Sequence, residues 1–159
     1  MAFSVLMVCT GNICRSPMAE GLLSHQLPET LKPYVNIHSA GTHGLYGNGA
    51  DPLAVRAAAA HGTDISHHRA RILEARMIRS ADLVLGMENY HLDYINRLLF
   101  FRCKYARLLG TFAPHGGSPE IDDPYGLAYA DYEAAANEIL ACMPGLIDYI
   151  RSRLPLKAS

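Results

Sequence analysis

Residues 5–17, VLMVCTGNICRSP, decide the fold, because an apolar run is followed there by a polar loop and then by the start of a helix. Residues 5–8 include no polar position, which predicts a strand covered on both faces of a sheet. Ser16 is a good N-cap, and Pro17 suits the first position of a helix. We therefore expect a strand, a loop over residues 9–15 and a helix that begins at Ser16 and Pro17.

The rest of the chain alternates short apolar runs with helical patterns. Further strands are expected at residues 35–38, 83–85 and 106–109. Helices are expected at residues 51–62, 73–81 and 88–99 and from about residue 130 onward, with Pro144-Gly145 kinking or dividing the last one. A Gly-rich loop covers residues 41–49, and a long loop covers residues 110–126. This order predicts an α/β fold, a single doubly wound domain over residues 1–159 with a four-stranded parallel sheet flanked by helices.

Composition excludes several classes of protein. The chain has 159 residues, 14 of them basic and 15 acidic, so its formal net charge is −1. Net charge thus gives no support to binding of nucleic acid or anionic membranes, and any charge that matters is local. No basic segment precedes the first apolar run, and the apolar runs are shorter than the roughly 20 residues of a membrane helix. Four cysteines are too few for a disulfide scaffold. We expect a cytoplasmic protein with no membrane insertion and no nucleic-acid partner.

The loop after the first strand has the residue types of an anion site. In doubly wound folds, ligands bind at the carboxyl ends of the strands. Gly11 and Asn12 adopt left-handed backbone angles more readily than other residues, which lets the N–H groups of the loop turn inward. Inward N–H groups, a helix N-terminus and an arginine fork all favour phosphate. The expected phosphate-binding residues are Thr10, Gly11, Asn12, Ile13, Cys14 and Arg15.

Cys9 lies at the rim of this positive concavity. A thiol beside a guanidinium and a helix N-terminus ionises readily, and the Ser16 hydroxyl can donate a hydrogen bond to the thiolate. A thiolate under a bound phosphate is a nucleophile aimed at phosphorus. The loop lacks the lysine of a Walker A sequence, which disfavours a nucleotide site. A zinc site on Cys9 and Cys14 would need two more ligands, and Cys103, Cys142 and the scattered histidines do not supply them, so we expect no metal.

A proton donor is expected in the long loop before the last helix. Departure of a phenolate benefits from a general acid. Residues 121–125, IDDPY, offer Asp123, with Asp122 as the weaker candidate. Pro124 stiffens the backbone behind the carboxylate, and Tyr125 supplies a flat apolar wall for an aromatic ring.

Residues 5–17 and 123–125 resemble the phosphate loop and the general-acid loop of the low-molecular-weight protein tyrosine phosphatases. The likeness in length and motif order spans nearly the whole chain. It implies the phosphotyrosine phosphatase I-like fold and hydrolysis of protein phosphotyrosine without a cofactor. It further implies that Cys9 forms a cysteinyl-phosphate, that Arg15 clamps the phosphate and that Asp123 is first the acid and then the base.

The same resemblance implies supporting residues and a subtype. Asn12 would hold the loop in shape, assisted by Ser39 and His68. Residues 39–52, with GLYGNGADP over 44–52, look most like bacterial members linked to exopolysaccharide export, which act with tyrosine autokinases. A phosphotyrosine protein of that kind is the implied substrate and partner. The chain has no Trp, so Leu45 or Tyr46 would form the wall that faces Tyr125.

Cys14 has two interpretations. In a curled loop its sulfur could meet that of Cys9, and a reversible disulfide would protect Cys9 from irreversible oxidation. Alternatively, Cys14 is a small residue that fills space behind the loop.

Two other functions compete with the phosphatase. A thioredoxin-coupled arsenate reductase resembles this family, but it needs further thiols on a mobile segment, and residues 80–96 contain no cysteine. A silent phosphate-binding module would be favoured by loss of Cys9 or Asp123, and both are present.

Several polar residues are given no role in the chemistry. Arginines 69, 71, 76 and 79 are interpreted as a solvated helix face. Seven histidines show no ligand spacing: His25, His38, His43, His61, His67, His91 and His115.

Overall fold

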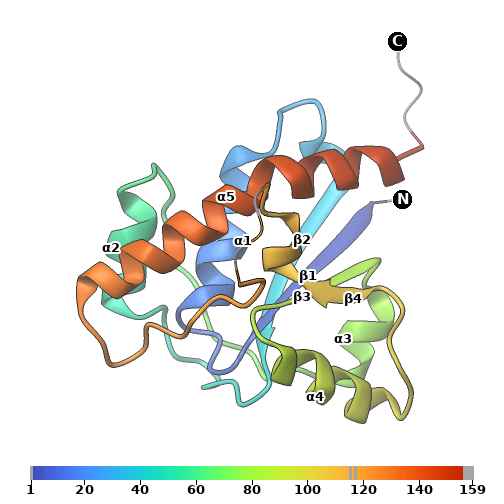
Figure 1. The fold of residues 1–159 in the computed structure, drawn as a ribbon, viewed down its shortest axis with the longest axis horizontal. Helices are drawn as coiled ribbons and strands as arrows, with labels where there is room; N and C mark the ends of the chain where they lie inside the picture. Colours follow the sequence, from blue (N-terminus) through green and yellow to red (C-terminus); the bar gives the residue numbers. More distant parts are fainter. Residues whose placement is uncertain (1, 115, 117, 156–159) are drawn as a thin grey trace.

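Four parallel strands form one sheet in the computed structural model, which describes residues 2–114, 116 and 118–155. The strands are β1 (Phe3–Cys9), β2 (Val35–Gly41), β3 (Leu83–Gly86) and β4 (Ala106–Leu108). Their order across the sheet is β2-β1-β3-β4 (Figure 1). The predicted α/β fold with a four-stranded parallel sheet is therefore confirmed.

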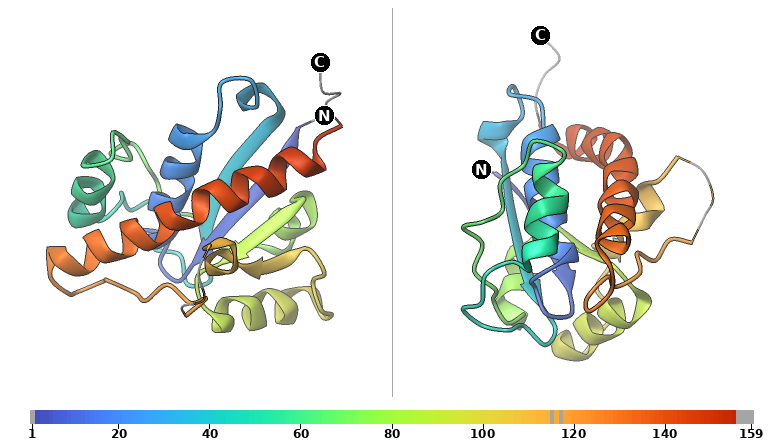
Figure 2. Two further views of the ribbon diagram at one scale, coloured as in Figure 1. Left: turned by 45° about the horizontal axis from the view of Figure 1, so that its top comes forward. Right: turned by 90° about the vertical axis from the view of Figure 1, so that its left-hand side faces the viewer.

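Helices cover both faces of the sheet (Figure 2). One face carries α1 (Arg15–Gln26), α2 (Pro52–Ala59) and α5 (Tyr129–Arg153), and the other carries α3 (Ala75–Ser80) and α4 (Asn89–Leu99). Two short 3-10 turns, η1 (Lys32–Tyr34) and η2 (Leu109–Phe112), precede β2 and follow β4. Val5 and Met7 of β1 enter the core on the α1 side, whereas Leu6 and Val8 enter the core on the α4 side. The unbroken apolar run of β1 thus fills two cores at once.

The first helix begins two residues earlier than expected, at Arg15 instead of Pro17, and without a side-chain cap. Its N-cap is Cys14, and no side chain caps its first turn, so the N-cap role assigned to Ser16 is wrong. The Ser16 hydroxyl is instead bound to Cys9 and Asn12. A hydroxyl engaged in the loop is not available to the amides of the helix.

The last helix is bent but not divided at Pro144-Gly145. α5 runs unbroken with Pro144 inside it, and its ribbon changes direction along its length (Figure 1). A Cβ on Gly145 would lie 2.6 Å from the carbonyl oxygen of Phe112. Glycine therefore lets η2 pack directly against the helix.

Other boundaries differ by a few residues. β2 extends to Gly41 because it stays paired with β1 as far as Cys9. α2 ends at Ala59, before the left-handed turn at Gly62, and α3 is limited to residues 75–80. Within the described residues, no helix combines the length and the apolar character needed to cross a membrane.

The topology fixes the place of the site. After β1 the chain passes to the α1 face, and after β3, which is the neighbour of β1, it passes to the α4 face. This divergence opens a crevice at the carboxyl ends of β1 and β3, where ligands of doubly wound folds bind. The loop that follows β1 and the first turn of α4 meet there.

Candidate active site

Every carbonyl of the loop from Cys9 to Cys14 is bound from outside the loop. The amides of residues 42, 43 and 45 donate to the carbonyls of Cys9, Thr10 and Gly11, at 2.9, 2.9 and 3.0 Å. Asp51 N–H donates to Ile13 at 2.8 Å, and Met18 N–H donates to Cys14 at 3.1 Å. His68 Nε2 lies 2.7 Å from the Asn12 carbonyl. The loop is therefore anchored with its carbonyls directed away from its centre.

The amides of the same loop face the other way. The N–H groups of residues 11–15 find no acceptor among the described residues, although every carbonyl from Cys9 to Cys14 is satisfied. They lie at the N-terminus of α1, where the helix dipole also favours negative charge. An anion with several oxygens fits this arrangement.

Asn12 holds the loop in a shape that most residues avoid. Its backbone is left-handed, with φ at 58°. Its side chain is buried, and Nδ2 donates to Ser16 Oγ at 2.8 Å and to Ser39 Oγ at 2.9 Å. Oδ1 accepts the Arg71 N–H at 2.8 Å. Ser39 and His68, the two residues expected to assist Asn12, both contact it directly.

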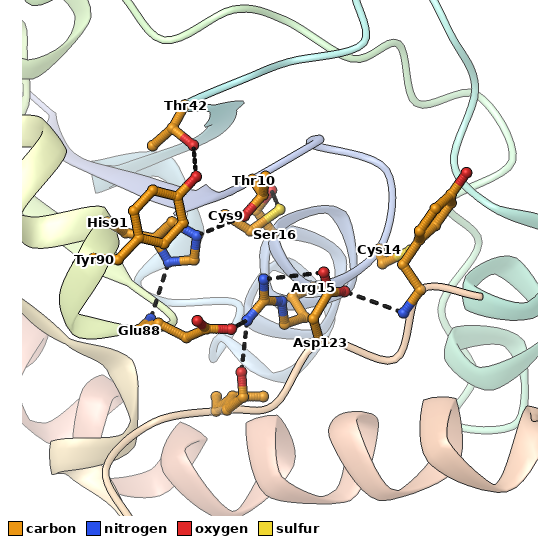
Figure 3. A network of polar contacts seen from close by, with 12 residues as sticks. Cys9, Thr10, Cys14, Arg15, Ser16, Thr42, Glu88, Tyr90, His91 and Asp123 are labelled. Atoms are coloured by element: carbon orange, nitrogen blue, oxygen red, sulfur yellow. Dashed lines mark hydrogen bonds and ion pairs between the residues drawn. The ribbon is translucent and has the colours of Figure 1, made fainter. Parts of the chain in front are cut away.

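The Ser16 hydroxyl lies within hydrogen-bond distance of the Cys9 sulfur. Cys9 Sγ lies 2.9 Å from Ser16 Oγ (Figure 3). Because Ser16 Oγ already accepts a hydrogen from Asn12 Nδ2, its own hydroxyl hydrogen is free to donate to the sulfur.

Arg15 is held from three sides. Its guanidinium is only 2% exposed, and Nη1 donates to Glu88 Oε1 and, at 2.7 Å, to the Ile121 carbonyl. Nη2 lies 3.7 Å from Asp123 Oδ2 (Figure 3). These partners balance a buried positive charge and fix its direction, because an unpaired buried charge is costly. The Asp123 carboxylate also accepts the Tyr125 N–H at 3.1 Å.

His91 joins the loop to α4. Its Nδ1 accepts the Glu88 N–H at 2.9 Å, so the ring hydrogen of the neutral imidazole is on Nε2, which lies 3.0 Å from Thr10 Oγ1. The ring is fully buried, and burial together with the charge of Arg15 lowers the pKa of His91 to about 3. His91 is therefore neutral at physiological pH and acts as a fixed hydrogen-bond donor to Thr10.

A cavity of about 280 Å³ opens above the loop. Its floor is formed by Cys9 and the residues that follow, and Asp123 stands at its side. Ile13, Leu45 and Tyr125 give it apolar walls. Tyr46 is not among the lining residues and is 78% exposed. A larger cavity of about 500 Å³ lies elsewhere, between α1 and residues 62–68, and contains none of the loop residues.

Comparison with known proteins places the chain in a family. Residues 4–155 match the model of the low molecular weight phosphotyrosine protein phosphatases. The chain belongs to this family. It is therefore a phosphatase, as the motifs around Cys9 and Asp123 led us to expect.

Relatives and solved structures agree with this membership. The low molecular weight protein-tyrosine-phosphatase Etp of Escherichia coli K12 is 41% identical over 122 residues, which cover 77% of each chain. The tyrosine phosphatase Wzb of Escherichia coli K30, solved in complex with sulphate, has a TM-score of 0.82 and 32% identity, covering 94% of this chain and 99% of its own. The YwlE arginine phosphatase of Geobacillus stearothermophilus also has a TM-score of 0.82 and 32% identity, covering 94% of each chain.

The sequence did not lead us to expect Glu88 and His91 in the active site. Both follow β3, at the same edge of the sheet as Cys9, and the strand order alone could have suggested them. Among the arginines interpreted as a solvated helix face, Arg69 and Arg71 lie outside any helix. Arg71 is half-buried and donates through Nε and Nη2 to the Ser39 carbonyl, so that interpretation is wrong for it.

The remaining predicted residues have other surroundings, although Cys14 lines the same cavity as Cys9. The Cys14 sulfur is buried against the Tyr132 hydroxyl, at 3.9 Å, and burial raises the pKa of its thiol to about 12. Asp122 does not line the cavity above the loop. His115 lies outside the described residues, and within them no cluster of three or more His, Cys, Asp or Glu side chains suits a metal ion.

Proposed function

We propose that this phosphatase hydrolyses phosphotyrosine in proteins through a cysteinyl-phosphate intermediate. The observation that carries the proposal is the loop between Cys9 and Arg15, whose carbonyls are all bound while its five consecutive amides 11–15 have no acceptor among the described residues. Amides and guanidinium supply the positive charge that equatorial phosphoryl oxygens need. The sulphate bound by the similar Wzb is an anion of the same shape and supports this use of the loop.

The first step transfers the phosphoryl group to sulfur. The Cys9 thiolate attacks phosphorus, a P–S bond forms, and the P–O bond to the phenol breaks. Protonated Asp123 gives its proton to the departing phenolate oxygen. Arg15 binds two phosphoryl oxygens while Glu88 and the Ile121 carbonyl keep its guanidinium in place.

The second step returns the enzyme to its starting state. Asp123, now a carboxylate, takes a proton from water as the water oxygen attacks phosphorus. The P–S bond breaks, inorganic phosphate leaves, and Cys9 is again a thiolate that accepts a hydrogen bond from Ser16. The donor that stabilised the nucleophile thus also stabilises it as a leaving group.

The walls of the cavity favour an aromatic leaving group. Ile13, Leu45 and Tyr125 offer apolar surface to a phenyl ring, and no carboxylate besides Asp123 lines the described cavity. A phosphoarginine side chain, the substrate class named for YwlE, carries several N–H donors that would need acceptors at these positions. Phosphotyrosine is therefore the substrate that we propose.

We also propose that the phosphoprotein substrate is a bacterial tyrosine autokinase of the exopolysaccharide machinery, and that the phosphatase acts on it in the cytoplasm. The likeness to the bacterial phosphatases Etp and Wzb supports this assignment. Tyr46 and Leu127 are exposed apolar residues close in sequence to the cavity walls Leu45 and Tyr125, and they would contact a peptide around the phosphotyrosine.

The cysteines do not support arsenate reduction. Cys103 is buried in the core on the α4 side of the sheet, and Cys9 belongs to the core on the other side. Cys142 is buried in α5, where its sulfur donates to the Glu138 carbonyl and burial raises the pKa of its thiol to about 11. A thiol relay to Cys9 is therefore not assembled.

The first test is hydrolysis of para-nitrophenyl phosphate without added metal by wild type, Cys9→Ser and Asp123→Asn. We expect no turnover by Cys9→Ser and a loss of roughly 10²–10⁴-fold in kcat for Asp123→Asn, the usual contribution of a general acid. Trapping of ³²P on wild type but not on Cys9→Ser identifies the intermediate. An unaltered kcat in Asp123→Asn would remove Asp123 from the mechanism.

Substrate class is tested with matched peptides. Wild type is compared on one peptide carrying phosphotyrosine, phosphoserine or phosphoarginine, and then on the phosphorylated tail of a tyrosine autokinase. The proposal requires the highest kcat/KM on phosphotyrosine. Preference for phosphoarginine would assign the chain to the activity of YwlE, and arsenate-dependent oxidation of thioredoxin would assign it to arsenate reduction.

A further inference from the structure

The turn after α4 presents two adjacent phenylalanines to solvent. Phe100 is 95% exposed and Phe101 is 60% exposed, while the flanking Leu99 and Cys103 are buried. The turn lies at the periphery of the molecule, between α4 and β4 (Figure 1). Two neighbouring aromatic rings this exposed indicate a surface that contacts another apolar phase.

The turn is held rigidly from both sides. Leu99 and Cys103 pack in the same core cluster. The Cys103 N–H donates to Asn96 Oδ1 at 2.9 Å, and the Phe100 N–H donates to the Arg97 carbonyl at 3.3 Å. These contacts therefore hold the turn, and with it the two phenylalanines, in a fixed position at the surface.

Phe100 occupies a backbone conformation that suits glycine better. Its φ is 62° and its ψ is 17°, the left-handed region at the C-terminus of the helix. Glycine or asparagine usually fills this position, because a bulky side chain is strained there. A phenylalanine that costs folding energy and makes little contact with its own core is best explained by an external partner.

Local charge around the turn is strongly positive, although the chain is nearly neutral. No acidic residue occurs between Tyr94 and Arg107, a stretch with four basic residues. Arg97, Arg102 and Lys104 are exposed, and none of them forms an ion pair with a described residue. Arg107 is not part of this group, because it is half-buried and its Nε donates to Thr111 Oγ1 at 3.0 Å. Arg97, in contrast, stays exposed with its guanidinium 5.7 Å from the Tyr94 ring centroid.

We propose that this aromatic-basic corner (Arg97, Phe100, Phe101, Arg102 and Lys104) docks on the surface of an anionic lipid bilayer. Exposed aromatic rings enter the boundary between headgroups and acyl chains, and flanking cations are attracted by anionic headgroups. A fluid interface accepts two protruding rings without a preformed pocket, whereas a protein partner would need a pocket for each. The corner thus fits a bilayer better than an acidic protein.

Docking leaves the cavity above Cys9 open. His91, in the first turn of α4, contacts Thr10 of the loop, and Phe100 follows the last residue of the same helix. Phe100 follows His91 by nine residues, so the corner lies about 14 Å along the helix axis from the site. A docked enzyme would keep its cavity close to the bilayer without burying it.

The absence of tryptophan from the chain allows a direct test. Phe100→Trp introduces a single fluorophore, which is mixed with vesicles of phosphatidylcholine alone or of phosphatidylcholine and phosphatidylglycerol in equal parts. We expect a blue shift of emission, and quenching by lipids brominated in the acyl chain, only with the anionic vesicles. Tyr34→Trp, at a 43% exposed position in η1, is the matched control and should give neither signal.

The outcomes separate the alternatives. No shift with any vesicle, or the same shift in the Tyr34→Trp control, rejects the bilayer as partner. If the corner instead binds an acidic protein, we expect no shift with any vesicle. The measurement reads binding and not turnover, so its failure is distinguishable from failure of the proposed phosphatase activity.

A second pair of variants uses the strain at Phe100. Phe100→Gly with Phe101→Ser relieves the left-handed backbone and should fold at least as well as wild type. We expect co-sedimentation with anionic vesicles to fall at least tenfold while hydrolysis of para-nitrophenyl phosphate is unchanged. Raising salt from 0.15 to 1 M, which shortens the Debye length from about 8 to about 3 Å, should release wild type as well. Undiminished vesicle binding by the double variant would overturn the proposal.

Discussion

At the scale of single residues, the site is built by buried polar groups that satisfy one another. Arg15 is almost fully buried and has Glu88, Asp123 and the Ile121 carbonyl as partners. Asn12 uses its side-chain oxygen and nitrogen to hold a left-handed backbone. Because each buried group has its partners, the loop is preorganised before substrate binds.

Neutral His91 makes stability depend on pH. The folded protein holds the His91 pKa at about 3, whereas its ordinary value is 6.5, so between these values the unfolded chain binds one proton more. The free energy of unfolding therefore falls as pH decreases through this window, by at most about 2 kcal/mol between pH 7 and pH 5.

The test is urea unfolding of wild type and His91→Gln at pH 7 and pH 5. Glutamine at this third helical position accepts the Glu88 N–H but does not titrate, so the variant should lose less stability on acidification. Identical losses in both proteins would show that His91 does not carry this pH dependence.

Cys14 offers a redox prediction with its own pH dependence. Peroxide oxidises Cys9 to a sulfenic acid, and attack by the Cys14 thiolate forms a disulfide and releases the sulfenic oxygen as water. Wild type should then regain activity with dithiothreitol, and Cys14→Ser should not. Since the pKa of the Cys14 thiol is about 12, the recoverable fraction should rise with pH through the range 6–9.

Activity before and after dithiothreitol is the measurement for Cys14. Equal recovery in wild type and Cys14→Ser would leave Cys14 as a small residue that fills space behind the loop, contacting the Tyr132 hydroxyl.

At the scale of elements, the carboxyl end of β2 supports the phosphate loop from behind. Amides just beyond β2 bind the carbonyls of Cys9 and Thr10. Gly41, the last residue of β2, meets the same loop so closely that a Cβ would lie 2.3 Å from the Thr10 carbonyl oxygen. Strand and loop can approach this closely only because residue 41 lacks a side chain.

Gly41→Ala should therefore disturb both stability and catalysis. We expect a loss of about 1–3 kcal/mol in the free energy of unfolding, the usual cost of overpacking, together with a lower kcat/KM. Gly49→Ala is the matched control, because its Cβ would make only ordinary contacts, with Arg69 Nη1 at 3.5 Å and the His68 carbonyl oxygen at 3.9 Å. Thermal unfolding and para-nitrophenyl phosphate kinetics measure both effects, and a Gly41→Ala enzyme with wild-type stability would refute the close approach.

At the scale of the whole molecule, the last helix completes the core on the face of the sheet that carries α1. α5 packs against α1, α2 and η2, although these elements are far apart in sequence. Ile139 of α5 is fully buried in the core cluster that also contains Cys9. Global stability therefore depends on α5, while the catalytic groups belong to other elements.

Ile139→Ala tests this division. We expect the free energy of unfolding to fall by about 2–5 kcal/mol, as for other large-to-small changes in a core. KM for para-nitrophenyl phosphate should stay unchanged below the unfolding transition. Glu133→Ala, on the exposed side of the same helix, should stay within about 0.5 kcal/mol of wild type. A large change in KM for Ile139→Ala would show that α5 also positions the loop.

The amino-acid sequence alone determined the sheet, most helices, the family resemblance and the candidate roles of Cys9, Arg15 and Asp123. These features are local, because an apolar period or a loop between a strand and a helix is contained in a short stretch of chain. Only the tertiary structure decided the partners of these residues. Glu88 and His91 reach the loop because β3 lies beside β1, and Arg71 binds the Ser39 carbonyl of β2. Such contacts join positions up to 81 residues apart, and no local pattern in either segment specifies the other.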